Sequence, residues 1–285
     1  MVSIKVNATS ANLCVGFDVL GLALDISNTF TFEKSKEFSF EGFEKEYLTI
    51  NNNMVYDSYI EVFKRLNKEI IPVKITFKGD IPVSRGLGSS SSLIVAGVFG
   101  ANKILNNPLT KEELFDICAN LEGHPDNVGP AIYGNLVASY KKDDKFIPNI
   151  YNVSDKLKFM VVIPNYKIKT REARGVLPKE LGYSDIVNNL SRIVNLPKAF
   201  NDGNVELIKD LFIDKLHEPY RKKLIKEYET IRKLCDKKDV AFSISGSGST
   251  MLIISYNYDL YDEIKKLNLD IRKVKIGSGV LISEE

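Results

Sequence analysis

The first half of the chain alternates between short apolar runs, which are typical of β-strands, and longer segments with helical spacing. The clearest helical segment is 111–121, in which apolar residues recur three or four positions apart. Thr110 and Glu113 have the spacing of a capping box at its start, and Gly123 is a good terminator at its end. The pattern in this half predicts strands over 3–6, 38–43 and 73–77, and helices over 54–66, 92–105 and 111–121.

The second half groups its helices together instead of alternating them with strands. Residues 184–235 are typical of several helices, with breaks at Asp202-Gly203 and Glu218-Pro219. Helices grouped beside mostly antiparallel strands favour an α+β fold over a doubly wound parallel sheet. No linker divides the chain cleanly, so we expect two intimately packed domains, 1–150 and 151–285. Strands are predicted over 136–140, 158–163, 240–244, 250–256 and 271–276, with a turn at 142–145 and a short helix before the last strand.

Composition narrows the classes of function. The 285 residues are 44% hydrophobic and 27% charged, which is ordinary for a globular protein. Thirty-nine Lys and Arg against 37 Asp and Glu leave a net charge of +2, too little for a surface that neutralises nucleic-acid phosphates. Two histidines and three distant cysteines exclude structural zinc and His-rich metal sites.

The same features indicate where the protein works. An odd and sparse cysteine count suits a reducing cytosol. The first residues lack the basic start and apolar stretch of a signal peptide, and no run approaches the roughly 20 apolar residues of a membrane span. We therefore expect a cytoplasmic protein that acts on a small molecule, without nucleic-acid or membrane partners.

A Gly/Ser segment over 82–92 joins a predicted strand to a long apolar helix. Gly86 and Gly88 let the backbone turn and approach a ligand, and four serines then open the helix, where backbone N–H groups lack internal acceptors. Such a helix start binds anions. The segment lacks the lysine of a Walker A loop and the third glycine of a dinucleotide fingerprint. It predicts a phosphate site, the alternative being a loop that only starts the helix.

Polar and charged side chains are concentrated between Glu122 and Pro130. Glu122 falls at a helix C-terminus, where the macrodipole disfavours a carboxylate unless a cation lies nearby. Magnesium prefers oxygen ligands, usually one or two protein groups with substrate phosphates. Glu122 with a serine hydroxyl of segment 82–92 is thus a chemically sensible magnesium pair. The alternative is a solvated Glu122 and an Asp126 that only caps the next helix.

Three further segments leave their role open. Residues 7–21 mix small polar residues, glycines and one acid, and composition does not separate a binding loop from an ordinary turn. Arg174 and Arg221 each lie near the start of a predicted helix; arginine grips carboxylates through two parallel hydrogen bonds, yet most single arginines are surface residues. The turn 245–249 is either a loose hairpin or a second glycine loop near the phosphates.

Taken together, these segments resemble the GHMP small-molecule kinases. Residues 86–90 look like the phosphate-loop motif of that superfamily, and residues 245–248 look like its late glycine motif. Within the superfamily, residues 8–18, 122–128 and 218–221 look specifically like the homoserine kinases. The resemblance covers nearly the whole chain and keeps the motif order.

The resemblance implies a two-domain α+β fold, with an N-terminal ribosomal-protein-S5-like domain and a C-terminal ferredoxin-like domain. It implies transfer of the γ-phosphoryl group of ATP to the side-chain hydroxyl of L-homoserine, with Mg²⁺, as a step of threonine biosynthesis. Because relatives are often dimers, it is compatible with a homodimer, although no residue identifies the interface.

Site residues follow from the same resemblance, position by position. The triphosphate would meet Pro82, Val83, Ser84, Arg85, Gly86, Leu87, Gly88, Ser89, Ser90, Ser91 and Ser92, and the adenine would meet Asn53, Met54 and Val55. Magnesium would be held by Ser90 and Glu122. The substrate ammonium and hydroxyl would meet Asn12, Asp18, His124 and Asn127, and its carboxylate would meet Arg174 and Arg221. The catalytic candidates are Asp126 and Asn127; Asp126 is a base only if the reaction needs one, because homoserine kinases are thought to work without it.

Two other functions are weighed against this one. Another GHMP-type kinase could act on a hydroxy acid or an isoprenoid precursor, and the arginines suit any carboxylate; Asp18 favours a substrate ammonium, which mevalonate lacks. A nucleotide-sensing module without catalysis would show an eroded phosphate loop or metal carboxylate, and neither is eroded here. His217 has no role that the sequence indicates.

Overall fold

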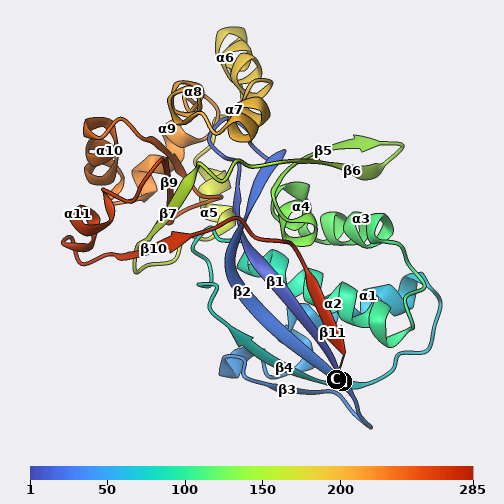
Figure 1. The fold of residues 1–285 in the computed structure, drawn as a ribbon. Helices are drawn as coiled ribbons and strands as arrows, with labels where there is room; N and C mark the ends of the chain where they lie inside the picture. The colour runs from blue at the N-terminus through green and yellow to red at the C-terminus, as the bar shows by residue number, and fades with distance from the viewer. Residues whose placement is uncertain (285) are drawn as a thin grey trace.

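The computed structural model describes residues 1–284, which form two β-sheets with helices packed against them (Figure 1). The larger sheet has seven strands in the order β11-β1-β2-β4-β3, and the hairpin β5-β6 pairs with β2. All of its pairs are antiparallel except that of β3 with β4. The strands are β1 (Val2–Ala11), β2 (Leu20–Lys34), β3 (Ser39–Glu41), β4 (Val73–Gly79), β5 (Leu136–Lys142), β6 (Lys145–Tyr151) and β11 (Leu281–Glu284).

The longest strand, β2, is absent from the elements predicted above. Its first five residues are buried on both faces, so they show no alternation between apolar and polar positions. The alternation appears only from Asn28 onward, where Phe30 and Phe32 point into the core. A register shift opposite Asn7 and Ala8 of β1 separates the two parts. The end of β1 and the start of β2 pack against residues of both halves of the protein. A search for strands with one apolar and one polar face therefore could not identify the start of β2.

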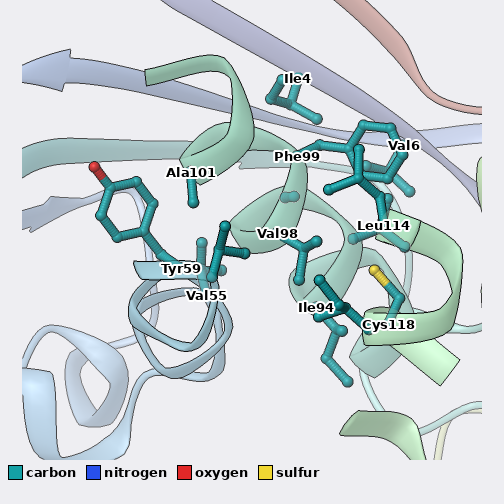
Figure 2. Packing of buried hydrophobic residues seen from close by; sticks show 14 of the residues in the cluster. Ile4, Val6, Val55, Tyr59, Ile94, Val98, Phe99, Ala101, Leu114 and Cys118 are labelled. Carbon is teal, nitrogen blue, oxygen red and sulfur yellow. The ribbon is translucent and has the colours of Figure 1, made fainter. Parts of the chain in front are cut away.

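The main helices of the first half pack against one face of this sheet (Figure 1). They are α1 (Met54–Arg65), α2 (Ser89–Ile104), α3 (Lys111–Glu122) and α4 (Pro125–Tyr133). Figure 2 shows the apolar core between them, with Val55 and Tyr59 of α1 beside Ile94, Val98 and Ala101 of α2. Gly97 allows this close approach, because a Cβ there would lie 2.4 Å from the carbonyl oxygen of Val55.

The smaller sheet is fully antiparallel, in the order β10-β7-β9-β8. Its strands are β7 (Lys158–Ile163), β8 (Ala241–Ile244), β9 (Met251–Ser255) and β10 (Asp270–Val274). The accompanying helices are α5 (Thr170–Gly175), α6 (Tyr183–Ile193), α7 (Leu196–Asp202), α8 (Val205–Leu211), α9 (Glu218–Arg221), α10 (Tyr228–Lys237) and α11 (Tyr261–Lys265). None of the helices in residues 1–284 is long and apolar enough to cross a membrane.

Most predicted elements are confirmed, including the α+β class and the capping box of α3, in which Thr110 and Glu113 bond each other's backbone. The polar stretch after Glu122 contains a helix that the sequence did not predict. Pro125 begins α4, with His124 as its N-cap residue. Proline is well suited to the first helical position, because its missing N–H would have no acceptor there.

The two halves are joined by a shared core. Leu20, Leu22 and Leu136 of the larger sheet pack with Phe159 and Phe200 of the second half in one buried cluster. The last strand, β11, returns to pair with β1, so the larger sheet contains residues from both ends of the chain. The predicted domain boundary near residue 150 stays a prediction. Strand β11 lies after that boundary in the sequence but belongs to the sheet of the first half.

Candidate active site

A cavity of about 420 Å³ lies where loops of the two halves meet. Its lining contains seventeen of the predicted site residues, drawn from six separate segments of the chain. These residues are Asn12, Asp18, Asn53, Met54, Val83, Ser84, Arg85, Gly86, Gly88, Ser89, Ser90, Glu122, His124, Asp126, Asn127, Arg174 and Arg221. Five predicted residues do not line it, namely Val55, Pro82, Leu87, Ser91 and Ser92.

The start of α2 faces this cavity with free backbone donors. Gly88 is the N-cap residue with a φ of 68°, and no side chain caps the helix. The first intrahelical bond runs from the N–H of Ser92 to the carbonyl of Gly88, so the N–H groups of Ser89, Ser90 and Ser91 precede the helical ladder. An anion bound there would gain from these donors and from the helix dipole.

The loop before α2 is held on both sides. Backbone N–H groups of Thr9 and Thr250 donate to the carbonyls of Leu87 and Arg85, at 3.1 and 3.0 Å. The Ser245 hydroxyl donates to the carbonyl of Gly86 at 2.6 Å. A Cβ on Gly86 would lie 2.2 Å from the carbonyl oxygen of Ser245. The turn 245–249 is therefore a second glycine loop packed against the first, rather than a loose hairpin.

Glu122 and the serines of α2 meet at the end of α3. The hydroxyls of Ser90 and Ser91 donate to the two carboxylate oxygens of Glu122, at 3.1 and 2.9 Å. Burial raises the pKa of Glu122, against the opposing effects of His124 and the two hydroxyls. A hard cation that shares Ser90 and Glu122 would relieve the cost of this buried carboxylate. Ser91 is buried and does not line the cavity, so its contact with Glu122 is its link to the site.

Part of the cavity has an aromatic wall. Phe43, Tyr47 and Phe77 line it together with Met54. Asn53 caps α1, since its side-chain oxygen accepts from the N–H groups of Val55 and Tyr56. Val55 itself is buried in the core, so of the three residues predicted near adenine only Asn53 and Met54 reach the cavity. The aromatic residues escaped sequence reasoning because they belong to no motif, and their place in strand β4 and in the segment after β3 does not show that they face a cavity.

Elsewhere in the lining, at what we call the amino-acid end of the cavity, a carboxylate and two guanidinium groups come together. Arg174 donates to both carboxylate oxygens of Asp18, at 3.0 and 2.8 Å. Arg221 is buried and lines the same part of the cavity. Burial, with the nearby charge of Arg174, lowers the pKa of Arg221 to about 10, so it stays charged at neutral pH. This end of the cavity thus offers one negative and two positive groups within one small volume.

Asn12 lines the cavity, but its side-chain amide is hydrogen-bonded to other parts of the protein. Its side-chain nitrogen donates to the carbonyl of Gly246 at 2.9 Å, and its side-chain oxygen accepts from the N–H of Asp18 at 3.1 Å. Asn12, Cys14 and Asp18 all have positive φ, a conformation that L-residues adopt at a cost. The segment 12–18 (the acid loop hereafter) therefore needs such tertiary bonds to hold its shape.

Next to the acid loop, His124 bonds Asp126 through Nδ1 and a carboxylate oxygen 2.5 Å apart. Burial disfavours the charged imidazole, but the hydrogen bond and the charge of Asp126 outweigh it, so the pKa of His124 is raised. The Thr9 hydroxyl donates to the side-chain oxygen of Asn127 at 2.8 Å, which fixes the planar amide with its nitrogen 3.4 Å from a carboxylate oxygen of Asp126. One ligand atom each of Asp18, His124 and Asp126 lies within 4.8 Å of the others. Each of the two carboxylates already has a partner, because Arg174 pairs with Asp18 and His124 pairs with Asp126.

Two side chains of this end were missed from the sequence. The ring of Phe17 lies 5.0 and 5.5 Å from the guanidinium carbons of Arg221 and Arg174, where it can stabilise both cations. Thr9 orients Asn127, as described above. Both occur within the motif 8–18, but neither is a residue type that by itself indicates a ligand or catalytic role. Only their contacts in the structure reveal what they do.

Comparison with known proteins agrees with this geometry. Residues 53–135 match the family model of the GHMP kinases N terminal domain, and residues 198–268 match that of the GHMP kinases C terminal. The chain is 41% identical to a homoserine kinase of Clostridium acetobutylicum over 259 residues, which cover 89% of this chain and 87% of the relative.

Two further comparisons cover almost the full length. A homoserine kinase of Clostridium botulinum (strain Langeland) is 37% identical over 286 residues, covering 97% of this chain and 96% of that protein. The crystal structure of a homoserine kinase from Cytophaga hutchinsonii superposes with a TM-score of 0.87 at 25% identity, covering 99% of this chain and 97% of that one.

The contact between His124 and Asp126 predicts how this histidine titrates. Because Asp126 stabilises the imidazolium, we expect His124 to hold its proton to a higher pH than an exposed histidine, and Asp126→Asn to lower its pKa. Histidine-selective NMR over a pH series measures this directly, since the chain has only two histidines. An unchanged titration in Asp126→Asn would contradict the assignment.

Proposed function

The chain belongs to the homoserine kinases of the GHMP kinase family, and we propose that it transfers the γ-phosphoryl group of ATP to the side-chain hydroxyl of L-homoserine. The observation that carries this proposal is the pairing of two sites in one cavity. A helix start suited to phosphate lies beside a group with one carboxylate and two guanidinium groups. The product, O-phospho-L-homoserine, belongs to threonine biosynthesis.

The charges at the substrate end suit an α-amino acid. Asp18 complements an ammonium, while Arg174 and Arg221 complement a carboxylate. Without substrate, Asp18 and Arg174 neutralise each other through two hydrogen bonds. A zwitterion can replace both halves of that ion pair at once, whereas a hydroxy acid can replace only one. This difference favours homoserine over mevalonate as the acceptor.

The nucleotide would extend from the aromatic wall to the start of α2. Phe43, Tyr47 and Phe77 are suited to flank a base, and Ser84 to Ser90 to surround the phosphates. Pro82, Leu87 and Ser92 support this loop from outside the cavity. Ser90 and Glu122 would hold Mg²⁺, which neutralises phosphate charge during phosphoryl transfer. The chain's contribution is to fix the phosphates and the hydroxyl in line.

We propose that Asp126 positions His124 and is not the catalytic base. One of its carboxylate oxygens is already bonded to His124 and lies 3.4 Å from the side-chain nitrogen of Asn127. Asp126 is also almost fully buried. A loose phosphoryl-transfer transition state needs little activation of the nucleophile, so positioning and charge can supply most of the rate.

The first test of the function is substrate selectivity. Release of ADP is measured with L-homoserine, L-serine, L-threonine and mevalonate, and we expect clear preference for L-homoserine. Asp18→Asn should raise the KM for L-homoserine by about 10-fold or more, because it removes the charge that complements the ammonium. The KM for ATP should change little, which serves as the internal control. Absence of turnover with L-homoserine, or faster turnover of mevalonate, would reject the function.

The second test concerns the base. General-base catalysis contributes about 10² to 10⁴ in rate. We therefore expect Asp126→Asn to lower kcat by less than about 100-fold, measured at saturating ATP and L-homoserine. A larger loss with an intact fold by circular dichroism would restore Asp126 as the base.

We further propose that the reaction takes place in the cytoplasm and that the chain forms a homodimer. Cys14, Cys118 and Cys235 are all unpaired, as a reducing compartment requires. The solvent face of α6 exposes an apolar stripe that no charged residue interrupts, with exposed fractions of 89, 60, 57 and 73% at Tyr183, Val187, Leu190 and Val194. The four apolar residues are separated by four, three and four positions, and this order is the same from either end of the helix. Two copies of α6 packed antiparallel can therefore cover each other's stripe.

Light scattering after gel filtration tests the dimer. We expect wild type to elute as a dimer and Leu190→Lys to elute as a monomer, because a charge would be buried at the centre of the stripe. Tyr140→Lys, at an exposed apolar residue of β5, is the matched control and should leave the dimer intact. A monomeric wild type, or a dimeric Leu190→Lys, would contradict this interface.

A further inference from the structure

His217, for which the sequence indicates no role, is fully buried. It lies between Cys14 of the acid loop and Arg221. It is the N-cap residue of α9, the short helix that carries Arg221. Its ring lies 5.4 Å from the ring of Phe17, which itself lies beneath both guanidinium groups. His217 therefore contacts the acid loop on one side and the carboxylate-binding arginine on the other.

The partners of the two ring nitrogens determine the tautomer. Nε2 lies 2.6 Å from the carbonyl oxygen of Cys14, which can only accept, so Nε2 carries a proton. Nδ1 lies 3.5 Å from Nη1 of Arg221, which can only donate, so Nδ1 offers a lone pair. Together these contacts require a neutral imidazole protonated on Nε2. An imidazolium would present a second N–H to the guanidinium.

The charged groups around the ring agree with a neutral histidine. Burial and the charge of Arg221 lower the pKa of His217 to about 4, against the opposing charges of Asp214 and Asp18. Asp214 lies 3.8 Å from Nε2, but its carboxylate accepts the backbone N–H groups of His217 and Glu218, both at 2.7 Å. Asp214 thus fixes the start of α9 without taking the imidazole proton.

Arg221 is held on one edge and free on the other. Its Nε donates to the carbonyl of Ala173 at 3.2 Å, and Nη1 donates to the carbonyl of Gly246 at 3.0 Å. Nη1 is also the atom that faces His217. Within residues 1–284, Nη2 has no hydrogen-bond partner, so it is the group available to a carboxylate in the cavity.

We propose that His217 is a positioning residue for amino-acid binding. Its neutral Nε2–H tautomer ties the acid loop to Arg221 and so fixes the distance between the group that binds the substrate ammonium and the group that binds its carboxylate. Cys14 and Asp18 belong to the same loop, so the bond to the Cys14 carbonyl sets where Arg221 lies relative to Asp18. Asp18 itself is also held by Asn12 and Arg174, independently of His217. This inference rests on the proposed function and assigns a specificity role to a residue outside the cavity.

Kinetics with two acceptors separate positioning from a general structural role. L-Homoserine uses both ends of the site, whereas (S)-2-amino-1,4-butanediol has an alcohol in place of the carboxylate. His217→Phe keeps the ring against Phe17 but removes both hydrogen bonds. We expect it to raise the KM for L-homoserine by about 10-fold, the size of one lost hydrogen bond to a charged group, with kcat and the KM for ATP within about 2-fold of wild type. For the diol, kcat/KM should stay within about 2-fold, because the diol does not use Arg221.

Two variants serve as controls. His217→Gln retains one donor and one acceptor without charge, and should recover L-homoserine affinity to within about 3-fold of wild type. Tyr228→Phe changes a buried ring of the same half that does not line the cavity, and should change neither acceptor. Equal losses for both acceptors in His217→Phe, or no recovery in His217→Gln, would overturn the proposal.

A nitrogen NMR spectrum tests the tautomer without activity. His217 should appear as a neutral Nε2–H imidazole between pH 6 and 8, assigned by its disappearance in His217→Gln. An Nδ1–H tautomer or an imidazolium would overturn the proposal even if the kinetics agree. If wild type does not phosphorylate L-homoserine, the proposed function fails, and the spectrum still decides the state of His217.

Discussion

The site depends on the way the loop before α2 is held between the two halves of the protein. Hydrogen bonds from Thr9, Ser245 and Thr250 reach three successive carbonyls of this loop, at Leu87, Gly86 and Arg85. They leave the N–H groups at the start of α2 pointing to the cavity, with no protein side chain as a cap. Because donors fixed in advance need no reorganisation when an anion arrives, this arrangement favours phosphate binding. The same contacts bring the late glycine loop and the acid loop to the cavity.

The electrostatics of the site rest on pairing instead of on net charge. A chain with a net charge of only +2 can still offer an anion site, because backbone amides and serine hydroxyls at the start of α2 supply the donors in place of a basic surface. Asp18 and Arg174 neutralise each other in the cavity, and the proposed zwitterionic substrate would separate them. Burying a charge costs less free energy when the charge has a partner of opposite sign both with and without substrate. Substrate choice would therefore depend on how the acid loop, which carries Asp18, is placed relative to α5, which carries Arg174.

Support from outside the cavity decides that geometry. Ser91 holds Glu122, Thr9 orients Asn127, and Phe17 lies beneath both guanidinium groups. His217 occupies the equivalent place between the acid loop and Arg221. Groups that touch a ligand hold their positions only when such partners fix their rotamers, so mutations at these residues are expected to act on affinity through a neighbour.

The sequence by itself determined the α+β class, most helices and strands, and the Gly/Ser loop that opens α2, because spacing, caps and glycines are local signals. It also indicated the chemistry of most cavity residues through their motifs. It missed β2, whose first residues are buried on both sides, the return of β11 to β1, and the helix that begins at Pro125. Only the tertiary structure decided which oxygens, nitrogens and rings meet. The pairs Asp18 with Arg174 and Cys14 with His217 are separated by 156 and 203 positions, and contacts at that distance depend on how whole sheets pack, which no local pattern encodes.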